Sequence, residues 1–122
     1  HPLAAMPEPL KNQDILQYRS ISAADSSRNL PPRTSGILTG QDVLTVPDMQ
    51  SKLQAQLQGL GVGYLPQALA ERYSKQGQLV IKRVAEPKPE VMAYLAWCSD
   101  GGKAQQWLLE AFSQLTLEQL LM

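Results

Sequence analysis

The sequence predicts an α/β domain in which short strands alternate with short helices. A run rich in β-branched residues, Val43–Val46, ends at Pro47 and has the length of a strand. Residues 48–58 carry apolar side chains at the spacing of one helix face, and Gly59 follows at the usual stop position. Since 43% of the 122 residues are hydrophobic and 18% are charged, the chain has enough apolar residues for a core. Strands and helices in alternation build a sheet with helices packed against it.

Each predicted strand has a local signal. Residues 91–98 are apolar without interruption, which is typical of a strand buried on both faces. Cys98, at the end of that run, is therefore expected to be a small core side chain. The glycines within residues 60–65 allow another backbone to approach closely. The predicted strands cover residues 18–23, 37–38, 43–46, 60–65, 79–84 and 91–98.

The clearest predicted helix follows the strand at 43–46. Asp48 is a good N-cap because its carboxylate can accept the unpaired amide hydrogens of the first turn. Met49, Leu53 and Leu57 recur every four residues and form one apolar stripe. Further helices are predicted for residues 66–77 and after residue 102, with one short helical turn at residues 14–16.

Proline-rich segments separate these elements. Residues 1–12 are expected to form an extended connector, and residues 24–36 are expected to form a loop. The stiff polar connector Glu86-Pro87-Lys88-Pro89 indicates that the chain passes there into another lobe. We therefore predict one lobe over residues 1–86, and a connector with a further strand and helix over residues 87–122.

Charge and composition exclude several kinds of function. Eleven basic residues balance eleven acidic ones, which argues against a nucleic-acid-binding surface formed by this chain alone. Cys98 is the single cysteine, so an intrachain disulfide is impossible and a reducing, cytoplasmic compartment is the simpler expectation. No run of about 18 apolar residues is present, so we expect no membrane partner.

Catalytic and metal-binding patterns are missing as well. His1 is the only histidine and lies at the chain end, which leaves no positioned base for a nucleophile. No Cys/His set has metal-ligand spacing. The glycines of Gly59–Gly63 follow a helix and precede a strand, whereas a dinucleotide fingerprint follows a strand and opens a helix. We therefore predict no enzyme activity, no cofactor and no metal.

One arrangement indicates a ligand site. The strand ending at Thr45-Val46 stops at Pro47, and Asp48-Met49 begins a helix at the carboxyl end of that strand. In open α/β sheets, small ligands bind outside such strand ends, often against helix N-terminal amides. A purely structural helix cap explains the same spacing.

Several segments, in the right order, resemble the effector-binding domain of LysR-type transcriptional regulators. The central match is Val46-Pro47-Asp48-Met49 followed by Leu57-Gln58-Gly59-Leu60-Gly61-Val62-Gly63-Tyr64-Leu65-Pro66, which is similar to the family's strand, helix and "G-x-G-(aliphatic)-x-x-x-P" stretch. The other matches are His1-Pro2-Leu3-Ala4, Asp14–Tyr18, Gly77–Val80, Tyr94–Trp97 and Trp107–Phe112. The resemblance covers nearly the whole chain.

The resemblance implies a type II periplasmic-binding-protein-like fold, in which two α/β lobes enclose a ligand cleft. Residues 1–86 are then the second lobe, with a mixed sheet and flanking helices. Residues 87–122 are the hinge connector and the return strand and helix of the first lobe. The chain is expected to be the C-terminal portion of the domain, cut from a longer protein.

The resemblance also implies a ligand-sensing function. A small effector in the cleft modulates DNA binding by an N-terminal helix-turn-helix outside this sequence, and the parent is a homo-oligomer, a dimer or a tetramer. The implied effector-binding residues are Thr45, Val46, Pro47, Asp48 and Met49, with Gly63 and Tyr64 as a second set. The alternative is a substrate-binding lobe of a solute-binding or transport-associated α/β protein.

Asp48 is a departure from the members of this family that bind acids, and it predicts the chemistry of the effector. If Asp48 caps its helix, its carboxylate competes with an anionic effector for the same amides. This competition predicts a neutral, cationic or aromatic effector and disfavours a dicarboxylate.

Overall fold

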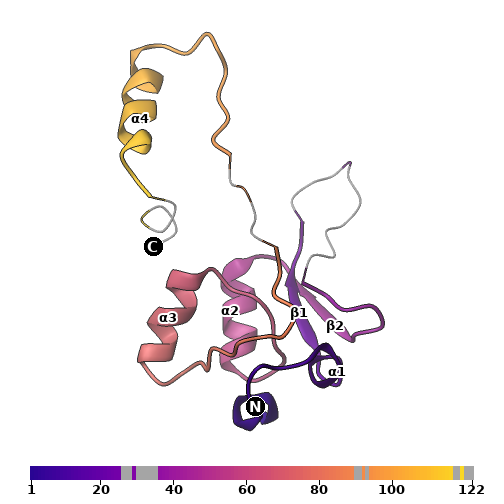
Figure 1. The fold of residues 1–122 in the computed structure, drawn as a ribbon. Helices are drawn as coiled ribbons and strands as arrows, with labels where there is room; N and C mark the ends of the chain where they lie inside the picture. The colour runs from indigo at the N-terminus through magenta and orange to yellow at the C-terminus, as the bar shows by residue number, and fades with distance from the viewer. Residues whose placement is uncertain (26–28, 30–35, 90–91, 93, 117–118, 120–122) are drawn as a thin grey trace. The chain divides into compact units, whose positions relative to one another are not determined.

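A computed structural model of the chain describes residues 1–25, 29, 36–89, 92, 94–116 and 119 (Figure 1). The chain divides into two compact units, His1–Lys88 and Pro89–Met122. The first unit contains the sheet and most of the helices, and each unit is described by itself below.

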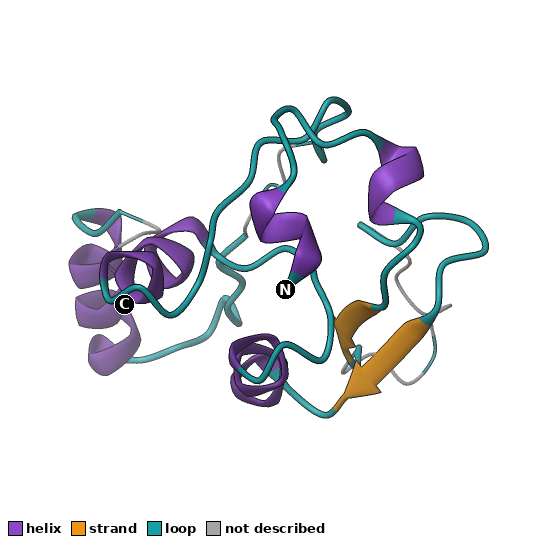
Figure 2. Cartoon of the chain, turned by 90° about the horizontal axis from the view of Figure 1, so that it is seen from below, coloured by secondary structure: helices purple, strands orange, loops and turns teal. Residues whose placement is uncertain are grey.

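The first unit is organised around strand β1 (Ser20–Ala23). Strand β2 (Val43–Val46) runs parallel to it, in a register that pairs Ala23 with Val46 (Figures 1 and 2). On the other side of β1, Val62 pairs with Ser20, also in parallel. The Ile21 N–H donates to the Val62 carbonyl over 2.8 Å, and the Val62 N–H donates to the Arg19 carbonyl over 2.9 Å. Strand β1 is therefore the middle one of three parallel segments.

Helix α2 (Met49–Leu57) covers β1 and forms the centre of the core. It starts where the sequence predicts, with Asp48 as N-cap, and Gly59 follows its end with a φ of +72°. Leu53 of α2 and Ile21 of β1 are the largest fully buried side chains among the described residues. Since α2 contacts both β1 and β2, it holds the strands together from one face of the sheet.

The other helices of this unit are short. Helix α3 (Gln67–Lys75) begins after Pro66, as predicted, although Pro66 is the capping residue and not the first helical one. A 3₁₀ turn, η1 (Pro2–Ala5), and helix α1 (Asn12–Ile15) form within the segment around residues 1–16. The predicted extended connector at 1–12 is therefore wrong at residues 2–5, where Pro2 favours the first turn of a helix and the turn buries Leu3.

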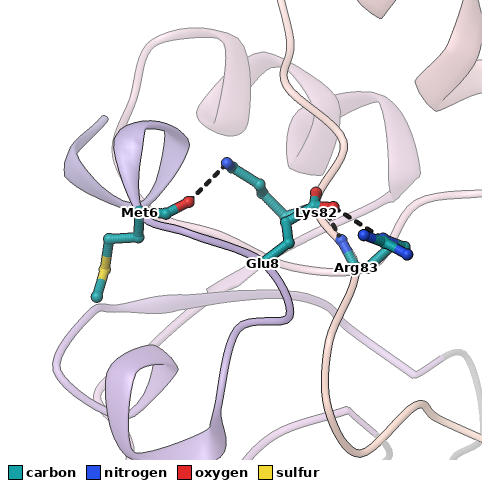
Figure 3. Close-up of polar contacts among 4 residues, drawn as sticks. All are labelled: Met6, Glu8, Lys82 and Arg83. Carbon is teal, nitrogen blue, oxygen red and sulfur yellow. Dashed lines mark hydrogen bonds and ion pairs between the residues drawn. The ribbon is translucent and has the colours of Figure 1, made fainter.

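A second parallel pairing joins the N-terminal segment to residues near the end of the first unit. Leu10 pairs with Val84, and the Leu10 N–H donates to the Arg83 carbonyl over 2.9 Å. Beside this pair, the Glu8 carboxylate accepts a 2.8 Å hydrogen bond from Arg83 Nε, and Lys82 Nζ donates to the Met6 carbonyl (Figure 3). The strand predicted at 79–84 does not form, and within this range only Val84 makes a β-bridge, the one to Leu10.

The Glu8–Arg83 pair gives the first unit a pH-dependent contact. Hydrogen bonds from Arg83 lower the pKa of the Glu8 carboxyl below its ordinary value of 4.5. Because the folded state favours the carboxylate, the contact stabilises the fold above that value and is lost as the pH falls through the lowered pKa. We expect the urea midpoint of the wild type to fall more between about pH 6 and about pH 3 than that of Glu8→Gln. Equal declines in the two proteins would contradict this assignment.

In the second unit the structure describes helix α4 (Lys103–Ser113), which follows the glycine turn as predicted. The described residues of the predicted strand 91–98, namely 92 and 94–98, form no strand and are exposed, with Tyr94 at 83% and Trp97 at 58%. Cys98 is exposed too, so its predicted core position is wrong. A strand buried on both faces needs neighbouring strands, and the described part of this unit supplies none.

Two further expectations concern strand pairing. All strand pairings among the described residues are parallel, so the antiparallel pair of the predicted mixed sheet is not seen in them. Residues 37–38 form no strand. Most of the predicted loop at 24–36 lies outside the described residues.

Candidate functional site

The two predicted sets of site residues lie on opposite sides of β1. Parallel pairing of β1 with β2 places Val46 beside Ala23, at the carboxyl end of β1. The parallel bridge between Ser20 and Val62 lies at the other end of β1, so the next residue, Gly63, lies beside Ile21, and a Cβ on it would be 2.9 Å from the Ile21 carbonyl oxygen. Residues 45–49 and 63–64 thus flank the second part of β1, a region that we call the edge, whereas the sequence could only propose them separately.

The β2 side of this edge is open to solvent. Thr45, Pro47 and Asp48 are exposed, Val46 is half-buried, and the Met49 side chain is 41% exposed. An Asp48 carboxylate oxygen accepts a 2.7 Å hydrogen bond from the Ser51 N–H. This bond to the first helical turn holds the pKa of Asp48 below its usual value. The predicted cap is confirmed, and the Asp48 charge is directed back onto its own helix.

The other side of the edge depends on close backbone packing at glycines. A Cβ on Gly61 would come within 2.5 Å of the Arg19 carbonyl oxygen, and one on Gly63 within 2.9 Å of the Ile21 carbonyl oxygen. No other residue fits here without displacing β1, which confirms the predicted close approach. Tyr64, the next residue, is 40% exposed, and Lys88 Nζ lies 5.8 Å from the centre of its ring.

Four residues at or beside this edge are missing from the sequence prediction. The Ala24 N–H donates to the Val46 carbonyl over 2.7 Å and extends the ladder by one residue. Lys52 and Gln56 of α2 both reach Gly63, with Lys52 Cε 3.3 Å and Gln56 Nε2 2.9 Å from the position of a Cβ there. The fourth is Lys88 beside Tyr64. Lys52 and Gln56 could have been found in the sequence, since they follow Asp48 at intervals of four on one helix face.

A hollow of about 570 Å³ opens within the first unit. Its lining includes Gly63, Tyr64 and Gln56, and it extends past Leu3 and Val80. Residues 45–49 do not line it, so the hollow includes only the second of the two predicted sets. It can accept an apolar group beside Tyr64.

The described residues offer nothing for a metal centre or a membrane span. Among them, no group of three or more His, Cys, Asp or Glu side chains is placed to hold a metal ion. In the same residues, no helix has both the length and the apolar character to cross a bilayer. The site's chemistry is thus that of backbone amides, two lysines, an amide side chain and a phenol ring.

Comparison with known proteins identifies the family of the chain. A sequence model of the LysR substrate binding domain family matches residues 1–118. The chain is 35% identical over 115 residues to the HTH-type transcriptional activator AllS of Salmonella typhimurium, covering 93% of this chain and 37% of that protein. It is 36% identical over 108 residues to the uncharacterized HTH-type transcriptional regulator YeeY of Escherichia coli, covering 88% of this chain and 35% of that protein.

The chain thus spans slightly more than a third of the length of these relatives. The match includes the segments at 46–49 and 57–66 that suggested the family, and it extends over nearly all of the α/β fold described above. The chain belongs to the family of LysR substrate-binding domains.

Proposed function

We propose that this chain is the ligand-sensing part of a transcription regulator, and that a small effector binds at the edge formed by residues 45–49 and 63–64. The observation that carries the proposal is the parallel pairing of β1 with β2 and with Val62, which brings residues 45–49 and 63–64 to the two sides of β1 in a chain of this family. Strand ends and helix N-terminal amides at such an edge are where small ligands bind in α/β sheets.

The response to the effector depends on a difference in affinity. An effector shifts the protein between two arrangements only as far as it binds one of them more tightly. We propose that the two lobes of the domain, or two subunits of a homo-oligomer, are the parts that rearrange. DNA binding then changes through a helix-turn-helix domain outside this sequence, and the parent protein acts in the cytoplasm. The named relatives, both HTH-type regulators, support this assignment.

The proposed lobes follow the two units of the chain. We assign residues 1–86 to the second lobe and residues 87–122 to the hinge connector with the return strand and helix of the first lobe. A boundary between Lys88 and Pro89, within the same proline-rich connector, supports this division. The exposed apolar residues of the second unit are those that neighbouring strands of a lobe would cover.

The regulator assignment is favoured over a solute-binding or transport-associated lobe, because the matched relatives are HTH-type regulators. We assign the site no catalytic role, since the matched relatives are regulators.

Effector-dependent DNA binding tests the proposal. The full-length protein is incubated with fragments of its own genome, with and without metabolites that raise its melting temperature. We expect at least one such metabolite to change the affinity for a selected fragment about tenfold, which is within the usual range of allosteric coupling. We expect Met49→Ala, at the exposed edge, to reduce this response while binding without metabolite persists.

Met6→Ala serves as the matched control, because Met6 lies in the N-terminal segment and only its main-chain atoms make described hydrogen bonds. A full response in Met49→Ala together with a lost response in Met6→Ala would contradict the proposed site. DNA binding that no metabolite changes would contradict the sensing function itself.

A further inference from the structure

Three side chains of the first unit gather around Gly63 and Tyr64. Lys52 and Gln56 extend from α2 to Gly63, where they come within 3.3 Å and 2.9 Å of the position that a Cβ would take. Lys88 lies against Tyr64, with Nζ 5.8 Å from the ring centre. The side chain of Lys52 therefore brings one ammonium group toward Gly63, and Lys88 places a second one beside Tyr64.

The structure gives the two ammonium groups no ion pair in the described part of the chain. The ion pairs given by the structure there join Arg19 to Asp42 and Arg83 to Glu8, and neither involves Lys52 or Lys88. Burial lowers the pKa of Lys52, and the like charge of Lys88 lowers it further. The fold therefore keeps a half-buried cation next to another cation, an arrangement that an anion would relieve.

The amide of Gln56 adds an unused hydrogen-bond donor at the same place. Its Nε2 is buried and has no hydrogen-bond partner among the described residues. Buried polar groups are nearly always paired, so a donor without a partner at a candidate site indicates an acceptor that binds there. Gln56 also lines the hollow that includes Gly63 and Tyr64.

We propose that Lys52, Lys88 and Gln56 form a carboxylate-binding subsite for a small organic acid, with Tyr64 beside the apolar body of that acid. This inference rests on the proposed effector site and specifies the chemistry of its ligand. Ammonium and amide N–H groups donate to a carboxylate in charge-assisted hydrogen bonds. The exposed Tyr64 ring and the hollow next to it receive the rest of the molecule.

The subsite replaces the expectation of a neutral, cationic or aromatic effector that Asp48 alone suggested. The Asp48 carboxylate is bonded to the Ser51 N–H of its own helix. The two lysines therefore supply the uncompensated charge at the glycine side of the edge.

Titration of the full-length protein with matched pairs of probes tests the subsite. The probes are benzoate and succinate, each compared with its neutral amide, together with inorganic phosphate. We expect at least one carboxylate to shift the backbone amide signals of Gly63 and Tyr64, while its amide does not. We expect Lys52→Met and Lys88→Met each to weaken that binding about tenfold, as loss of one charge-assisted bond does.

Lys75→Met is the matched control, because Lys75 lies in the last turn of α3 and makes the same change of charge away from the cluster. We expect it to leave the affinity unchanged. Stability provides a second readout: Lys52→Met should raise the urea midpoint, because it removes a half-buried cation with a like-charged neighbour. A lysine with a purely structural role would instead lower the midpoint when replaced.

The outcomes separate this inference from the function on which it rests. Carboxylate binding of equal strength in the wild type and Lys52→Met would overturn the subsite, as would a site that accepts phosphate and neither carboxylate. Shifts of Gly63 and Tyr64 by neutral metabolites alone would overturn the subsite and leave the effector site standing. If no carboxylate, amide or screened metabolite shifts these signals, both proposals fail.

Discussion

Leu53→Ala is expected to lower the free energy of unfolding by about 2–5 kcal/mol, the usual cost of emptying a fully buried leucine position. Leu53 has no exposed surface, and it lies on the helix that covers β1. Its loss leaves a cavity beneath α2, which also carries Lys52 and Gln56. We expect the effector response to weaken together with stability, because these side chains depend on the position of the helix.

Urea unfolding of the full-length protein measures this effect, with Leu60→Ala as the control. Leu60 is 48% exposed and follows the end of α2, so its truncation should cost less than about 1 kcal/mol. Equal losses in the two variants would mean that Leu53 is not the centre of the core.

Gly61→Ala has the second large expected effect. The new methyl group would lie 2.5 Å from the Arg19 carbonyl oxygen and 2.9 Å from Cγ1 of Ile21. The carbonyl belongs to the main chain, so β1 and the segment around Val62 must separate. We expect a cost of at least about 1–3 kcal/mol, the range for overpacked sites, and loss of the two hydrogen bonds that join Val62 to β1.

Amide hydrogen exchange at Ile21 and Val62 reports on these bonds directly. In the wild type both amides are bonded across the pairing, and in Gly61→Ala we expect them to exchange faster. Gly102→Ala is the control, because a Cβ there meets no atom within 4 Å. Unchanged protection of Ile21 and Val62 in Gly61→Ala would contradict the role given to this glycine.

The parts of the fold that local sequence determines could be predicted. Asp48 has the side chain of an N-cap, Gly59 suits a positive φ after a helix, and the β-branched run at 43–46 favours a strand. These features depend on residues within one or two turns of each other. The structure confirms them with a strand at Val43–Val46 and a helix at Met49–Leu57.

Features that depend on distant partners could not be predicted in the same way. Residues 91–98 have the apolar pattern of a buried strand, but that pattern requires neighbouring strands, and the described residues there are exposed. The pairing of Leu10 with Val84 joins segments far apart in the chain, and no local sequence pattern predicts it.

The candidate site shows the same limit. Its two sets of residues could be predicted one at a time, whereas their placement on the two sides of β1 follows from the pairing of β1 with two different segments. Lys88 approaches Tyr64 only through the tertiary fold. A net charge of zero for the whole chain conceals two neighbouring lysines without a carboxylate partner among the described residues.

Backbone amide mapping of an effector found by melting-temperature screening is the most direct measurement of the central claim. It compares the amide signals of the full-length protein with and without the effector. We expect the largest changes at residues 45–49 and 63–64, on the two sides of β1. Changes confined to α3 or α4, with residues 45–49 and 63–64 unaffected, would contradict the claim that the effector binds where these strands end.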